Sequence, residues 1–102
     1  MTDEPVDLTV RASIDVSGGL DAATGPLLIE RVRRLCAGGL RELTIDLDGL
    51  EFIDSRGLGA LIHCRRLVHR QGADLHLLCA GGPARHLLAA SGLDSVFGLE
   101  ER

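Results

Sequence analysis

The sequence predicts a single α/β domain in which helices pack on a mixed β-sheet. Three features support this class: segments of alternating hydrophobicity, apolar residues at helical spacing between them, and glycine pairs where one pattern changes into the other. Strands that alternate with helices are typical of parallel pairing in the middle of a sheet. With 102 residues, the chain is long enough for one domain with one core.

The first part of the chain predicts a strand region followed by a helix. Apolar and polar residues alternate over residues 6–16, which predicts one long strand or two short ones, and Ser17-Gly18-Gly19 ends the pattern. Apolar side chains then recur at helical spacing from about Gly25 until Gly38-Gly39 stops the helix. We expect residues 1–5 to be a flexible N-terminus and 6–102 to be the folded domain.

The rest of the chain continues the alternation. Residues 43–48 have the period of a half-buried strand, and residues 56–69 have a helical period. Residues 74–80 are apolar at nearly every position, as expected for a strand covered on both faces. Pro83 fits the first turn of a last helix, Gly92 closes this helix, and a short final strand follows.

Composition excludes several classes of function. The net charge of −4 argues against nucleic acid, and the only two aromatic residues, Phe52 and Phe97, offer no stacking platform for bases. The chain contains no lysine, which excludes Schiff-base chemistry and Walker-type phosphate loops. The three cysteines are widely spaced and lie in apolar patterns, so we expect buried small hydrophobic residues, no metal and no cofactor.

Hydropathy indicates a cytoplasmic protein with no membrane contact. The longest apolar runs are only a few residues, far short of the roughly 20 that cross a bilayer. The first residues are acidic and polar, unlike a secretory signal peptide.

The stretch around Ser55 is the candidate site, because a strand pattern becomes a helix pattern there. Asp54 or Ser55 can cap the helix, which leaves the Ser55 hydroxyl at a helix N-terminus. Free N–H groups and the helix dipole would tolerate an anion there, such as a phosphate. Gly57 and Gly59 would let another backbone come close.

These segments resemble STAS domains, and the resemblance covers nearly the whole chain from Val6. The matching segments are Gly19-Leu20-Asp21, the strand at 43–47, the run Phe52-Ile53-Asp54-Ser55-Arg56-Gly57-Leu58-Gly59-Ala60-Leu61, Pro83 and Ser91-Gly92-Leu93. Stand-alone STAS domains of this length resemble anti-sigma factor antagonists. The family usually has Ser or Thr at the position of Arg56, so this chain departs from the pattern beside its serine.

The resemblance implies a regulator that is not an enzyme. Its unphosphorylated form would bind an anti-sigma factor that is a serine-protein kinase; phosphorylation of Ser55 would end binding, and a serine phosphatase would reverse it. The chain would be a monomer or a weak homodimer. The residues expected to meet the partner are Asp21, Asp54, Ser55, Arg56, Leu58 and Ile62.

Alternatives remain open at each position. Ser55 and Asp21 could simply be helix caps, and Leu58 and Ile62 could pack against the first helix. A serine hydrolase is disfavoured, because Ser55 lacks a glycine elbow and a nearby histidine. Two other functions compete: an unphosphorylated STAS scaffold subunit of a lipid-trafficking or transporter assembly, and a nucleotide-binding module using the Asp21 and Ser55 loops.

Overall fold

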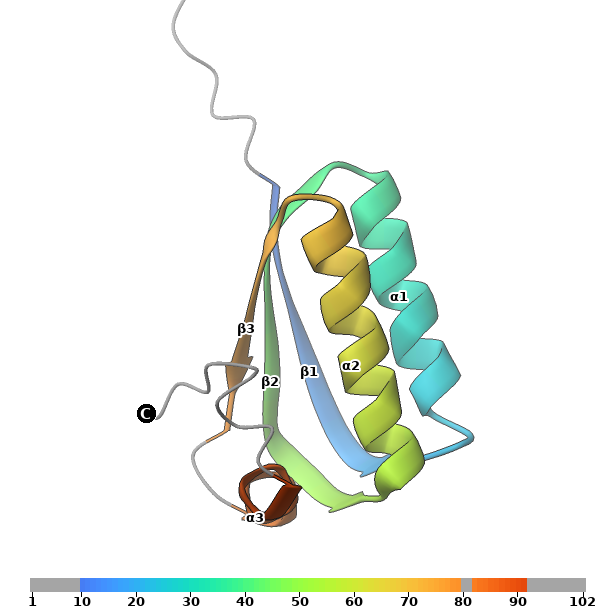
Figure 1. The fold of residues 1–102 in the computed structure, drawn as a ribbon, viewed down its shortest axis with the longest axis vertical. Helices are drawn as coiled ribbons and strands as arrows, with labels where there is room; N and C mark the ends of the chain where they lie inside the picture. Colours follow the sequence, from blue (N-terminus) through green and yellow to red (C-terminus); the bar gives the residue numbers. More distant parts are fainter. Residues whose placement is uncertain (1–9, 80–81, 92–102) are drawn as a thin grey trace, which may run out of the picture.

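In the described residues, three strands and three helices alternate; Figure 1 shows how they are arranged. The computed structural model describes residues 10–79 and 82–91. Their elements are β1 (Val10–Leu20), α1 (Gly25–Ala37), β2 (Leu40–Ile53), α2 (Ser55–Arg70), β3 (Asp74–Leu78) and α3 (Gly82–Ser91). The predicted α/β class is confirmed. The predicted N-terminus (1–5), the start of the first predicted strand (6–9) and the predicted final strand lie outside the described residues.

The sheet has the order β1-β2-β3, and both pairings are parallel. The central strand β2 places Ile45 between Ile14 of β1 and Leu77 of β3. Each of these side chains is buried in the core. Parallel pairing in the middle of the sheet, predicted from the alternation of strands and helices, is confirmed.

The first two strands continue further toward the C-terminus than predicted. Ser17-Gly18-Gly19 does not end β1, which continues to Leu20, and β2 extends well beyond the predicted range of 43–48. The pairing with β2 continues through register shifts between Asp15 and Ser17 and between Gly18 and Gly19. Gly18 adopts a positive φ of 73°, a conformation that costs glycine little. Inter-strand hydrogen bonding therefore overrides the local turn signal.

Helices α1 and α2 lie side by side on one face of the sheet, whereas α3 packs against β2 on the other side (Figure 1). The core lies between the sheet and this helix pair, where the alternating β2 residues meet the inner faces of α1 and α2. Its fully buried members include Leu43, Ile45, Leu47, Val32, Leu61 and Val68. The predicted periods of the strand and both helices are thus confirmed by burial.

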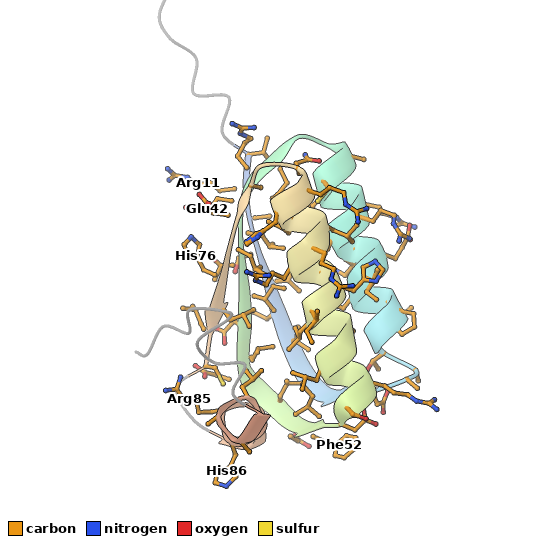
Figure 2. The ribbon with its side chains drawn as sticks, in the orientation of Figure 1. Arg11, Glu42, Phe52, His76, Arg85 and His86 are labelled. Atoms are coloured by element: carbon orange, nitrogen blue, oxygen red, sulfur yellow. The ribbon has the colours of Figure 1, made fainter. Side chains whose placement is uncertain are left out.

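The sheet face away from α1 and α2 is polar near the start of the strands. Glu42 lies between two basic side chains, with Arg11 Nε 3.3 Å from one carboxylate oxygen and His76 Nε2 3.5 Å from the other (Figure 2). The three residues come from β2, β1 and β3 respectively. They are partly exposed, and ion pairs of this kind contribute little to stability.

The two outer helices are held close to each other at both ends. Near their N-termini, a Cβ on Gly25 would lie 3.0 Å from the Cβ of Ala60, so α1 and α2 are already in contact there. At the other end, the Gln71 side chain donates hydrogen bonds to the carbonyl of Cys36 and, at 3.4 Å, to that of Leu40. The orientation of α2 relative to α1 and β2 is therefore fixed along its length.

Gly57 lets the first turn of α2 contact the end of β1. A Cβ at this position would lie 2.0 Å from the carbonyl oxygen of Leu20 and 3.1 Å from Ile53 Cγ1. No real Cβ tolerates the first distance, so α2 can start here only with glycine at this position. Gly59 differs, because a Cβ there would meet no atom within 4 Å. The expectation that both glycines admit a neighbouring backbone is correct for Gly57 and wrong for Gly59 within the fold.

This difference predicts opposite effects on stability. Gly57→Ala should lower the free energy of unfolding by about 3 kcal/mol or more, because the new methyl overlaps a backbone carbonyl in a packed region. Gly59→Ala should raise it by roughly 0.5–1 kcal/mol, because alanine is the better helix former. Urea denaturation followed by circular dichroism measures both. Equal effects of the two substitutions would contradict this account.

Candidate functional site

The candidate site forms where β1 and β2 end. Leu20 and Ile53 are paired in the sheet, so the residues that follow them, Asp21 and Asp54, leave the same edge next to each other. The backbone N–H of Asp54 donates to the Leu20 carbonyl at 3.3 Å, which ties the two chain segments together. In α/β sheets, ligands bind outside the carboxyl ends of parallel strands.

Asp54, not Ser55, caps α2. Its Oδ1 accepts hydrogen bonds from the N–H groups of Arg56 at 3.0 Å and Gly57 at 2.9 Å. Ser55 is the first helical residue and is exposed. In the part of the chain that the structure describes, no group hydrogen-bonds the Ser55 hydroxyl. The hydroxyl is therefore exposed, and modifying it would break no hydrogen bond to the described residues.

The helix end is already partly occupied by a negative charge. The Asp54 carboxylate uses two of the N–H groups that the sequence suggested were available for an anion. A phosphate on Ser55 would have to share this helix end with that carboxylate. Arg56 is adjacent and exposed, so it supplies a positive charge at the same place.

Asp21 holds the turn between β1 and α1. Its Oδ1 accepts from the N–H groups of Ala23 at 2.9 Å and Thr24 at 3.1 Å, and the Thr24 hydroxyl lies 3.1 Å away. The Thr24 N–H, and then that of Ala23, stabilises the ionised form, so the pKa of Asp21 lies below its ordinary value of 3.8 despite some desolvation. Asp21 therefore stabilises the turn but does not cap the helix, because the N-cap of α1 is Thr24, whose side chain makes no capping hydrogen bond.

Asp21 and Arg56 both line an open groove between α1 and α2. The groove has a volume of about 340 Å³, and its other walls include Gly25, Ile29, Gly59, Ala60 and His63. Small residues from both helices keep it open. The structure thus brings Asp21, Asp54, Ser55 and Arg56 to one end of the helix pair.

Leu58 and Ile62 lie on the other flank of α2. Neither lines the groove between the helices, and both are partly buried against the hydrophobic core. With about 100° between successive residues, they face away from the flank that carries Arg56 and His63. This placement does not favour the alternative that they pack against the first helix, and each side chain retains an exposed portion.

Phe52 is a candidate site residue that the sequence analysis did not select. Its side chain is 52% exposed. It is the second-last residue of β2 and lies two residues before Asp54, which caps α2. Its ring covers Gly19, where a Cβ would lie 3.6 Å from it (Figure 2). Strand alternation from the buried Ile53 was the available signal, because it places Phe52 on the opposite face.

The cysteines offer no reactive thiol. Cys64 and Cys79 are buried and Cys36 is partly buried, as predicted. Burial, with a smaller effect from Cys36, raises the pKa of Cys64 to about 12, and burial also raises the pKa of the other two thiols. These thiols pack as small hydrophobic groups.

The described residues lack two specific features. No group of three or more potential metal ligands gathers in residues 10–79 and 82–91. Within the same ranges, no helix is both long and apolar enough to span a bilayer.

The geometry defines a class of protein: an α/β domain whose exposed polar site lies at the carboxyl edge of a parallel sheet, at the start of a tightly docked helix. The family model of the STAS domain matches residues 6–102. The chain therefore belongs to the STAS domain family, as its motifs suggested.

Similar proteins carry related names. The chain is 25% identical over 88 residues to the anti-sigma-B factor antagonist of Staphylococcus aureus. The matched region is 86% of this chain and 82% of that protein. It is 28% identical to the anti-sigma F factor antagonist of Paenibacillus polymyxa, over 81% and 72% of the two chains. Its fold matches the crystal structure of an anti-sigma factor antagonist from Mycobacterium paratuberculosis, with a TM-score of 0.77, 28% identity, and 88% and 76% coverage. These names describe proteins that act on another protein, and none describes a reaction.

The lowered pKa of Asp21 predicts a pH dependence of stability. A carboxylate whose pKa is lower in the folded state stabilises the fold above the unfolded value near 3.8, and this contribution disappears as the pH falls through the folded pKa. Melting temperatures of the parent and Asp21→Asn should therefore differ most above about pH 4 and converge below it. Curves that run parallel down to the acid limit would contradict this role for Asp21.

Proposed function

We propose that this chain is an anti-sigma factor antagonist controlled by phosphorylation of Ser55. The unphosphorylated form binds a cognate anti-sigma factor that is a serine kinase, and the sigma factor is thereby freed. Phosphorylation ends binding, and a serine phosphatase restores it. The observation that carries the proposal is the exposed Ser55 hydroxyl at the start of α2, left without a structural role because Asp54 caps the helix.

The names of the similar proteins support the role, and the site supports its control. A kinase must reach the acceptor hydroxyl without unfolding the substrate. Ser55 meets this condition, because it is exposed at an edge formed by two strand ends and one helix end. The serine is held in a defined place by the Asp54 cap and the close contact of Gly57 with β1.

Phosphorylation would act on binding through charge. It adds about −1.5 to −2 charges at pH 7. They would appear beside the Asp54 carboxylate and at the end of the groove that Asp21 lines, with Arg56 offsetting part of them. A partner surface fitted to a neutral hydroxyl would meet repulsion and the cost of desolvating a phosphate. Phosphorylation then changes the affinity for the partner and leaves the fold unchanged.

Substitutions at Ser55 separate binding from folding. Ser55→Ala should keep affinity for the anti-sigma kinase and block incorporation of phosphate. Ser55→Asp should lower affinity by about tenfold or more, equivalent to about 1.4 kcal/mol, with a melting temperature close to the parent's. Isothermal titration calorimetry and a kinase assay with labelled ATP measure these outcomes.

A matched control is Ser13→Asp, because Ser13 is an exposed serine on β1 and the substitution adds the same charge away from the site. This variant should bind like the parent. If Ser55→Asp also binds like the parent, or if the kinase never modifies Ser55, the scaffold function replaces the switch.

Phe52 should be an apolar anchor of the same interface. Exposed aromatic residues beside a binding site often supply much of the binding energy. Phe52→Ala should weaken binding of the anti-sigma kinase about tenfold or more, which corresponds to about 1.4 kcal/mol. Leu27→Ala is the control, because Leu27 is 65% exposed on α1 and does not line the groove beside Arg56. Equal losses of affinity in both variants would rule out a specific role for Phe52.

A further inference from the structure

The charge of this chain is distributed very unevenly. Helices α1 and α2 contain seven of the eleven arginines and a single acidic residue, Glu30. The rest of the chain contains four arginines and fourteen acidic residues. The helix pair therefore carries a net charge of +6 within a protein whose total is −4. The helix layer is therefore strongly basic, although the net charge of the whole chain is negative.

The two helices differ in how their arginines are compensated. On α1, Arg33 and Arg34 pair with Glu30 at 3.5 and 3.3 Å. Helix α2 contains four arginines and no acidic residue. In the part of the chain that the structure describes, no carboxylate lies within ion-pair distance of an α2 arginine. The uncompensated positive charge is concentrated on α2.

The arginines of α2 form a basic face that begins at Ser55. We define this basic face as Arg56, Arg66 and Arg70, all of which are exposed. Arg66 lies opposite the buried stripe of the helix and eleven residues after Ser55, close to three full turns. Ser55 and Arg66 therefore point from the same side of α2, about 16 Å apart along its axis.

We infer that the basic face of α2 docks an acidic segment of a protein partner, whose carboxylates lie along the helix while another part of the partner covers Ser55. The guanidinium fork of arginine matches a carboxylate in bidentate geometry, and arginine loses little entropy when it is held. The inference rests on the proposed function only for the identity of this partner, because the basic face is independent of whether Ser55 is modified.

The surroundings of the basic face favour protein carboxylates over nucleic acid. Asp21 and Asp54 lie at one end of it and would repel the regular charge of an extended polyanion. It has no Phe, Tyr or Trp on which bases could stack. Beside it run an open groove with an apolar wall, including Ile29, and the small open position of Gly59. Mixed apolar and charged surfaces of this kind are typical of protein interfaces.

An acidic partner would also explain how one phosphate reverses binding. A phosphoserine at position 55 would stand at the end of the basic face, opposite a surface that already carries negative charge. It would also attract Arg56 away from the partner. Both effects weaken the same electrostatic contact, so the modification would reduce association as well as the lifetime of the complex.

The first experiment measures association of the full chain with the anti-sigma kinase at about 0.05 and 0.3 M NaCl by stopped flow. Arg66→Glu should slow association about tenfold or more at low salt and remove most of the salt dependence. Arg66→Gln should produce a smaller loss in the same direction. The control is Arg31→Glu, which makes the same change in charge on the flank of α1 that faces β1. Association rates of Arg31→Glu should stay within about twofold of the parent.

A second probe separates this inference from the proposed function. If no anti-sigma kinase binds the parent chain, the proposed function fails, whereas NMR titration of the labelled chain with a glutamate-rich peptide still tests the basic face. The peptide should shift amide signals along α2, and Arg66→Glu, but not Arg31→Glu, should abolish the shifts. Three results would overturn the inference: no shifts on α2, equal losses in both variants, or tighter binding of a single-stranded DNA of equal charge.

Discussion

The contact between Gly57 and the Leu20 carbonyl is the constraint on which the site depends. It allows α2 to start directly against the end of β1, so the Asp54 N–H reaches the same carbonyl oxygen. Any side chain at Gly57 would move the helix outward. The consequence would be local and severe, because the cap, the serine and the turn of Asp21 are all placed by this one approach of helix to strand.

The residues around the site have separate tasks. Two aspartates complete the local fold, Asp21 in the turn before α1 and Asp54 at the start of α2, and both use their carboxylates for backbone N–H groups. Because Asp54 caps α2, Ser55 does not have the capping role that a serine at a helix N-terminus usually has. A hydroxyl with no structural contact can change its charge without changing the fold, which suits a switch that acts on binding.

The charged regions of the molecule do not coincide with its packing layers. The apolar core lies between the sheet and the α1–α2 pair, and the polar face of the sheet carries the Glu42 ion pairs. The outer side of the helix pair is basic, whereas the carboxyl edge of the sheet, with Asp21 and Asp54, is acidic. Ser55 lies at the boundary between these two regions. A charge added at this boundary affects both, which is why the location matters as much as the residue.

The sequence by itself determined the α/β class, the core faces of the central strand and both long helices, and Ser55 as the candidate acceptor. The core faces could be predicted because the spacing of apolar residues shows which side of a strand or helix is buried. Ser55 could be selected because the residues of its motif are contiguous in the sequence. Only the tertiary structure decided that β1 continues through Ser17-Gly18-Gly19, because the hydrogen bonds that extend it come from β2. It also distinguished Gly57 from Gly59, placed Leu58 and Ile62 on the outer flank, and exposed Phe52. These properties depend on which atoms of distant segments lie within a few ångströms, and no local pattern encodes that distance.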